Sequence, residues 1–299
     1  MDLLIQTKRH STIAKLLQIE HVIIAVNKMD LIGYDQTKYD QIVKAYNEFA
    51  QQLGLKDVTP IPLSALAGDN VVDKGENLDW YDGPTLITLL ESLSVYDASH
   101  DEPFRFPVQL VARHNGHEAN DFRGYMGRIE AGKVSIGDKL IVQPGGQTGT
   151  VKEILTLGAS LQSAAVGQSI TILLNEYLDI SRGDMLSLAT RPATLIKNVD
   201  ADVCWLSEEP LDFKRKYLLK HTTRQVAARV TEIDSLLDIN TQQTRGATEL
   251  QLNDIARVKI TVQQPLAADN YDEIRSTGAF ILIDQVTHQT VAAGMIRLT

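Results

Sequence analysis

Several features that mark other classes of protein are scarce in this sequence of 299 residues. It has a single cysteine, Cys204, which excludes an internal disulfide and fits a reducing compartment. No apolar run approaches the roughly 20 residues that a membrane-spanning helix needs, and the opening apolar stretch is too short for a signal peptide. Acidic residues outnumber basic ones by 38 to 29, and the net charge of −9 argues against a broad nucleic-acid surface. We therefore expect a cytoplasmic protein without membrane contact and with little role for nucleic acid.

The chain is organised around an apolar run that ends in a polar motif. Val22–Val26 contains five apolar residues without alternation, which is typical of a strand buried on both faces of a parallel sheet. Asn27-Lys28-Met29-Asp30 follows directly. Open α/β sheets bind ligands at the carboxyl ends of such strands. An ordinary polar turn is the alternative, and the preceding strand favours a binding loop.

The side chains of this motif have the chemistry to read guanine. The Asp30 carboxylate can accept hydrogen bonds from the ring N–H and the exocyclic amine of guanine. Adenine lacks both donors at these positions, so it would leave the carboxylate unpaired, and a site of this kind rejects such an analogue strongly. Asn27 can bridge the base and a neighbouring loop, while the Lys28 stem can lie along the base. The motif predicts a guanine-binding loop.

The first third of the sequence alternates helices and strands. Helices are predicted at residues 6–18, 35–53 and 84–93, and strands at 22–26 and 58–63, the second strand ending in Ser64-Ala65-Leu66. This order predicts the carboxyl-terminal half of a doubly wound α/β domain over residues 1–99.

The remainder of the sequence is all-β in pattern, with short β-branched runs separated by glycine turns. A first set of strands is predicted at 107–111, 124–130, 139–143, 148–156 and 168–174. A second set is predicted at 201–206, 216–220, 224–233, 255–262, 278–284 and 291–297. We expect two successive β-barrels, over residues 100–192 and 193–299.

This order of parts resembles the translation-factor class of GTPases, which includes elongation factor Tu. Ser64-Ala65-Leu66 is similar to the last guanine-contacting loop of that class, and Arg123–Asp138 is similar to its second domain. Asp179–Asp184, Trp205–Leu211 and Thr277–Asp284 narrow the resemblance to the large subunit of bacterial sulfate adenylyltransferase.

The resemblance implies a GTP-binding regulatory subunit with a defined partner. Its GTPase cycle would drive the small adenylyltransferase subunit, which converts ATP and sulfate to adenylyl sulfate and diphosphate in sulfate assimilation. The implied guanine contacts are Asn27, Lys28, Asp30 and the loop Ser64, Ala65 and Leu66. The alternative is an elongation factor that binds aminoacyl-tRNA. The acidic balance and the motifs of the second barrel favour the first interpretation.

One part of the family pattern is not found in these residues. The phosphate-binding loop, the magnesium-binding Thr and the Asp-x-x-Gly switch of the family precede the strand that corresponds to Val22–Val26, and 21 residues precede that strand here. Gly127–Val134 resembles a phosphate loop, but Val134 replaces its Ser or Thr and no helix is predicted to follow. We expect a partial copy that recognises the base and is inactive alone, with Mg²⁺ bound only together with the missing half. No catalytic residue and no metal site is assigned.

Two further groups of polar residues are candidates for binding. Lys220, His221 and Arg224 gather at a predicted strand end, where they could form a partner or anion surface; a solvated strand end is the alternative. His114-Asn115-Gly116-His117-Glu118 has the close spacing of metal ligands, but no other Cys or His cluster accompanies it. A polar loop is the favoured interpretation of that segment.

Overall fold

A computed structural model describes residues 3–93, 102–114 and 122–298. The chain divides into two compact units, which we describe separately. Unit 1 comprises Met1–Tyr96 with Asp238–Gln243, and unit 2 comprises Asp97–Leu237 with Thr244–Thr299. The boundary expected near residue 99 lies outside the described residues. In the part of the chain that the structure describes, no helix is both long and apolar enough to cross a membrane.

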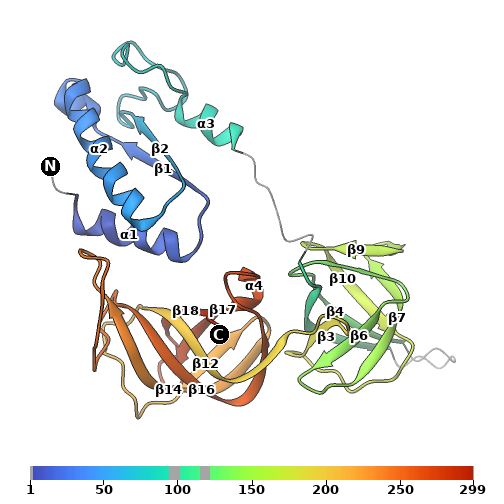
Figure 1. Ribbon diagram of the computed structural model, residues 1–299. Helices are drawn as coiled ribbons and strands as arrows, with labels where there is room; N and C mark the ends of the chain where they lie inside the picture. Colours follow the sequence, from blue (N-terminus) through green and yellow to red (C-terminus); the bar gives the residue numbers. More distant parts are fainter. Residues whose placement is uncertain (1–2, 94–101, 115–121, 299) are drawn as a thin grey trace. The chain divides into compact units, whose positions relative to one another are not determined.

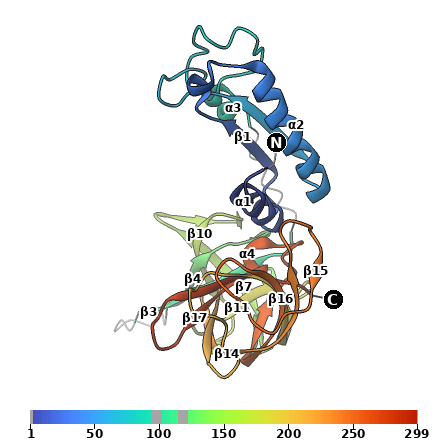
Figure 2. The same cartoon turned by 90° about the vertical axis from the view of Figure 1, so that its left-hand side faces the viewer.

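Unit 1 is built on a pair of parallel strands. Strand β1, His21–Val26, pairs with β2, Asp57–Pro62, in a register that places Val26 beside Pro62. The helices are α1 (Ile5–Leu16), the short 3-10 helix η1 (Met29–Ile32), α2 (Gln36–Leu53) and α3 (Leu86–Ser92). Figures 1 and 2 show α2 running beside the two strands. The predicted order of helices and strands is confirmed.

The longest helix of unit 1 is defined at both ends by its sequence. The Asp35 side chain accepts hydrogen bonds from the backbone N–H groups of Thr37 and Lys38, and so caps the first turn of α2. Gly54 ends the helix at φ 72°, a left-handed conformation that glycine adopts without steric cost. The buried positions are spaced to form one helical face: Tyr39, Tyr46, Phe49 and Ala50.

The central strand is less buried than its sequence predicts. Val22, Ile23 and Ile24 are half-buried and Ala25 is exposed, whereas Val26 is buried. Among the described residues β1 pairs with β2 alone, so its second edge and part of each face remain uncovered by this sheet. The prediction of a strand buried on both faces is therefore wrong for this structure, because burial of both faces requires more layers than unit 1 has here.

The first barrel of unit 2 is a closed ring of six strands. Its strands follow the order β10-β4-β3-β11-β6-β7, and pairing of β7 with β10 closes the ring. The strands that carry it are β3 (Arg105–His114), β4 (Phe122–Arg128), β6 (Lys139–Gln143), β7 (Thr148–Thr156), β10 (Ser169–Leu174) and β11 (Met185–Leu188). Three short strands accompany them: β5 (Lys133–Ser135), β8 (Ala159–Leu161) and β9 (Ser163–Ala165). The sequence pattern did not predict β11, which has four residues and no alternation in burial at its first three positions.

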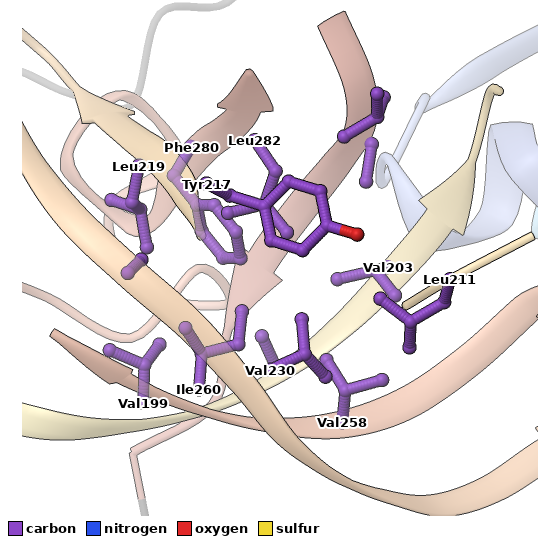
Figure 3. Close-up of a cluster of buried hydrophobic side chains, with 14 of the residues drawn as sticks. Val199, Val203, Leu211, Tyr217, Leu219, Val230, Val258, Ile260, Phe280 and Leu282 are labelled. Atoms are coloured by element: carbon purple, nitrogen blue, oxygen red, sulfur yellow. The ribbon is translucent and has the colours of Figure 1, made fainter. Parts of the chain in front are cut away.

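The second barrel is also closed, with the order β13-β17-β18-β12-β16-β14 and a pairing of β13 with β14. Its strands are β12 (Thr194–Trp205), β13 (Tyr217–His221), β14 (Arg224–Leu237), β16 (Ile255–Ala268), β17 (Ala279–Asp284) and β18 (Thr290–Ile296). Short β15 (Thr244–Arg245) and α4 (Arg275–Gly278) complete it. Figure 3 shows apolar side chains from different strands meeting in its interior, among them Tyr217, Val230 and Phe280. The predicted all-β region with barrel architecture is confirmed.

A buried ion pair joins the two barrels. The Arg105 guanidinium at the start of β3 donates to both carboxylate oxygens of Asp269, each at 2.7 Å. Arg105 is 2% exposed and Asp269 is 7% exposed. Thr277 Oγ1 also donates to Asp269, at 2.6 Å, so each charged group has several hydrogen bonds. A fully bonded pair of this kind compensates for the loss of hydration of both charges and fixes how the barrels meet.

Candidate functional site

The two loops predicted to read guanine lie side by side. Parallel pairing of β1 and β2 brings the residues after Val26 and after Pro62 to the same edge of the sheet. The backbone N–H of Leu63 donates to the Val26 carbonyl at 3.0 Å, and the N–H of Met29 donates to the Leu63 carbonyl at 3.3 Å. Met29 is fully buried between the polar residues Lys28 and Asp30, and so anchors the first loop.

Asn27 connects the two loops through its side chain. Its Oδ1 accepts a hydrogen bond from the backbone N–H of Lys28 at 2.7 Å and from that of Ala65 at 3.0 Å. The oxygen is therefore used within the protein, which leaves the Nδ2 amide group to donate to a base acceptor. Asn27 and Ala65 are both exposed, so a ligand can reach this side of the loops.

Asp30 is held by the second loop as well. Ser64 Oγ donates to Asp30 Oδ1 at 2.7 Å, and the same hydroxyl accepts from the backbone N–H of Ala67 at 3.2 Å. Ser64 is fully buried, whereas Asp30 is half-buried. Within the described residues Asp30 Oδ2 makes no hydrogen bond. One carboxylate oxygen thus fixes the orientation of the side chain, and the other can accept from a ligand.

Lys28 and Leu66 lie at the exposed margin of the same site. Lys28 has φ 67° and ψ 33°, a left-handed conformation that is uncommon outside glycine, and it precedes η1. Such strain is often retained at ligand-binding loops because the surrounding contacts fix it. Leu66 is 90% exposed, and Leu31, next to Asp30, is 74% exposed. The structure brings all six predicted guanine contacts to one edge of the sheet.

A network that the sequence did not reveal supports these loops. Tyr34 Oη donates to the Asp69 carboxylate, and Asn77 Nδ2 donates to Asp69 Oδ2 at 3.1 Å. The backbone of Asp69 accepts from the N–H of Ser64 at 3.1 Å, which ties the network to the second loop. The hydrogen bond to the Asp69 carboxylate, with burial, raises the pKa of Tyr34. No periodicity or motif connects positions this far apart in the chain.

One member of the second predicted group, His221, does not lie at the surface. His221 is 1% exposed, and its Nε2 donates to the Thr277 carbonyl at 2.7 Å. Burial lowers the pKa of His221, so the imidazole is neutral at pH 7. The prediction that His221 faces a ligand or partner is therefore wrong, because its side chain is buried and bonded to the Thr277 carbonyl. Lys220 is exposed, and Arg224 lies 3.3 Å from the Asp184 carboxylate.

The histidine-containing segment considered for metal binding lies mostly outside the described residues. Asn115, Gly116, His117 and Glu118 lie outside the described residues. Within the described residues, no three His, Cys, Asp or Glu side chains come together as a possible metal-binding group.

Comparison with protein families divides the chain in a way that agrees with its two kinds of fold. Residues 2–98 match the elongation factor Tu GTP binding domain, and residues 198–297 match the family described as GTP-eEF1A C-terminal domain-like. Among solved structures, that of Sup35 complexed with GMPPNP covers 98% of this chain, and this chain covers 72% of it, with a TM-score of 0.61 and 22% identity. At this identity the likeness shows the fold alone.

Curated proteins give a closer likeness. Sulfate adenylyltransferase subunit 1 of Shewanella woodyi is 44% identical over 293 residues, which are 98% of this chain and 61% of that protein. The bifunctional enzyme NodQ of a Rhizobium species is 43% identical over 292 residues, 97% of this chain and 44% of that protein. The chain therefore spans about three fifths, or less, of the length of these relatives.

Proposed function

The chain is a homologue of sulfate adenylyltransferase subunit 1 with an elongation factor Tu-like GTP-binding domain, and on this premise we propose that unit 1 binds the guanine base of GTP as part of a regulatory subunit of that enzyme. The observation that carries the proposal is the pair of loops joined through Asn27–Ala65 and Asp30–Ser64. The elongation-factor alternative is supported by the fold alone. A cytoplasmic location is part of the proposal and is consistent with the single cysteine.

The described residues fit the base better than the phosphates of the nucleotide. The half-buried Asp30 has a carboxylate oxygen to accept from guanine, and Asn27 has an amide group to donate. In GTPases of this kind the phosphates are bound by backbone N–H groups, a Lys and Mg²⁺. We assign none of the residues 3–93 to that role, so guanine affinity of this chain is expected to be weak and independent of Mg²⁺. Bound GTP would supply the phosphoryl-transfer chemistry.

The base-reading step is tested by calorimetric titration of the 299-residue chain with GTP and with ATP, each with and without Mg²⁺. We expect weak binding of GTP and none of ATP. Asp30→Ala should abolish the preference for GTP, because it removes the carboxylate that accepts from guanine. Asp40→Ala is the matched control, since Asp40 is an exposed carboxylate on α2 in the same unit.

Three results would contradict this proposal. Equal binding of GTP and ATP would show that the loops do not select guanine. Binding below one micromolar that requires Mg²⁺ would show that a phosphate site exists in these residues. GTP turnover by this chain should be absent, because none of residues 3–93 is assigned to binding the phosphates. Turnover that is present in the parent chain and lost in Asp30→Ala would therefore also overturn the assignment.

We further propose that the chain associates with the small adenylyltransferase subunit, whose reaction joins ATP and sulfate into adenylyl sulfate and diphosphate. The relative's designation as subunit 1 supports a partner subunit. Co-expression with the small subunit of the same genome, followed by purification at low and at high salt, tests it. A protein interface with an apolar core should survive added salt, whereas a tRNA complex should weaken steeply as counterions are taken up again. Salt-sensitive binding of aminoacyl-tRNA without binding of the small subunit would favour the elongation-factor alternative.

A further inference from the structure

Unit 2 contains a cavity of about 270 Å³ at a turn of the second barrel. We call it the hairpin cavity, and its lining residues come from the loop before β11, the β13–β14 hairpin and β16: Arg182, Lys220, Thr223, Arg224, Gln225 and Gln264. Both barrels of unit 2 thus contribute to one site. It is separate from the guanine-reading loops, which belong to unit 1.

The lining of the hairpin cavity is strongly positive. It has three cationic side chains and no carboxylate. Asp184 pairs with one of the three cations, since its Oδ1 lies 3.3 Å from Arg224 Nη1. Arg182 donates to the backbone carbonyl of Gln109 at 3.0 Å, and Lys220 is exposed on β13. Among the described residues no ion pair involves Arg182 or Lys220, so two positive charges there lack a paired carboxylate around a concave space.

Two polar atoms of the lining are buried without a partner. Thr223 Oγ1 and Arg224 Nε are inaccessible to solvent, and within the described residues neither has a hydrogen-bond partner. The rest of the Arg224 guanidinium is bonded, since Nη2 donates to Gln264 Oε1 at 3.0 Å and Nη1 lies near Asp184. Buried donors are satisfied in most proteins, and those that are not call for an explanation such as a bound ion. A hydroxyl and a guanidinium N–H are both donors suited to an oxyanion.

The backbone around the hairpin cavity is held in an unfavourable conformation. Pairing of His221 with Arg224 leaves Thr222 and Thr223 as a two-residue turn. Thr222 has φ 49°, a left-handed value that is disfavoured for a β-branched residue and that glycine or asparagine would adopt more readily. Opposite it, Gly183 has φ 96°, and a Cβ there would lie 3.3 Å from Arg224 Cα. The close approach of this loop to the hairpin keeps the cations together.

We propose that the hairpin cavity binds a dianionic tetrahedral oxyanion, sulfate or hydrogen phosphate, either free or as the terminal group of a small molecule. Lys220 and Arg182 supply the net charge, and Thr223 Oγ1 and Arg224 Nε, both closed to solvent in this structure, become donors to the anion when the turn at Thr222 shifts on binding. Charge-assisted hydrogen bonds of this kind are the strong class, and the guanidinium presents its N–H groups in a geometry that matches an oxyanion. The proposal is independent of guanine binding, because it concerns residues of unit 2.

The proposal is tested by calorimetric titration of the full chain with sodium sulfate, potassium phosphate and AMP, with sodium chloride at matched ionic strength as the reference. Saturable binding of a dianion, and none of chloride, is the expected result. Tighter binding of AMP than of phosphate would identify a nucleotide phosphoryl group as the occupant; equal or weaker binding would identify the free ion. Lys220→Gln should weaken binding about tenfold, because it removes one of two uncompensated charges. Lys197→Gln is the matched control, since Lys197 is exposed on β12 of the same barrel and does not line the cavity.

A second variant separates a binding role from a structural one. Thr223→Val keeps the shape of the side chain and removes the hydroxyl. In chloride this change should leave the melting temperature of unit 2 unchanged or raise it, because a buried polar atom without a partner is lost. In saturating sulfate the variant should gain less thermal stability than the parent chain. An equal gain of thermal stability in the variant and the parent would overturn the proposal. So would the absence of saturable dianion binding, or a loss of binding in Lys197→Gln as large as that in Lys220→Gln.

Discussion

Unit 1 and unit 2 differ in how completely they bury what their sequences make apolar. In unit 2 the two barrels have buried clusters of 15 and 24 residues. In unit 1 the buried cluster beneath the guanine loops has three members, Val26, Met29 and Tyr39. Helix α3 has no buried residue, although four of its 7 residues are apolar: Leu86, Ile87, Leu89 and Leu90. Closure of a β-barrel removes sheet edges, whereas the two-stranded sheet of unit 1 has an unpaired edge on β1 among the described residues.

The guanine loops and the barrels are ordered by different interactions. The guanine loops are organised by local hydrogen bonds, such as Asn27 to Ala65 and Ser64 to Asp30. The barrels are organised by closed ladders and large apolar interiors. A binding site can therefore be well formed in the part of the chain that has the smaller core.

Hydrogen exchange of backbone amides tests the comparison with the largest expected effect. Amides of β1 and β2 should exchange about ten-thousandfold faster, relative to their intrinsic rates, than those of β12 and β16, because opening of unit 1 exposes far less apolar surface. Mass spectrometry of the intact chain, followed by digestion, assigns the rates to each unit. Equal protection in both units would mean that the uncovered faces of unit 1 are covered in solution.

Loss of the ion pair between the barrels should have the next largest effect. Arg105→Ala leaves the Asp269 carboxylate buried without its main partner, which should cost about 3–5 kcal/mol of unit 2 stability. His21→Ala removes an exposed pair with Asp57 in unit 1, where a cost of about 1 kcal/mol or less is expected. Chemical denaturation of each variant measures both values. A similar, small cost in the two variants would show that the pair Arg105–Asp269 does not fix the barrels.

Features that are set by residues close together in the sequence could be predicted, whereas features that depend on distant residues could not. Helix α2 could be predicted with its ends, because Asp35, Gly54 and the spacing of Tyr39 and Tyr46 are local signals. The meeting of Asn27 and Ala65 followed from parallel pairing of two predicted strands.

Distant partners left no such signal. The pair Arg105–Asp269 joins positions 164 residues apart. Burial of His221 depends on Thr277, which comes from another part of the barrel. The half-exposed state of Val22–Val26 also depends on the number of strands around it, and the apolar run by itself does not fix that number.

The pH dependence of stability should differ between the units through His221. Burial lowers its pKa in the folded state, so the unfolded chain binds this proton first as pH falls below about 6.5. The stability contributed by neutral His221 is thus complete above that pH and is lost as the pH falls toward the folded-state pKa. The Asp269 carboxylate opposes this shift and Arg224 adds to it. Unit 2 should lose up to about 1.4 kcal/mol per pH unit as the pH falls below about 6.5.

Two histidine variants assign that loss. His221→Gln retains a donor for the Thr277 carbonyl and should remove the slope. His288→Gln, at an exposed histidine of the same barrel, should leave it unchanged. A slope that persists in His221→Gln would assign the pH dependence to another group.

The smallest effect that we predict compares one deletion made in both units. Tyr46 Oη is hydrogen bonded to Ser11 Oγ at 2.7 Å in unit 1, and Tyr125 Oη donates to the Leu178 carbonyl at 3.2 Å in unit 2. Tyr46→Phe and Tyr125→Phe should each cost about 1 kcal/mol, because each removes a largely buried hydrogen bond.

The same loss of stability should have different consequences for amide exchange in the two units. We expect unit 1 to open as a whole at low free energy, so Tyr46→Phe should raise exchange of nearly all its slow amides about fivefold. In unit 2 we expect local opening to precede global unfolding, so Tyr125→Phe should affect the amides near Leu178 and leave the slow amides of β16 unchanged. If both variants change exchange throughout their units, then the barrels open as cooperatively as unit 1, and the difference between the units is one of magnitude alone.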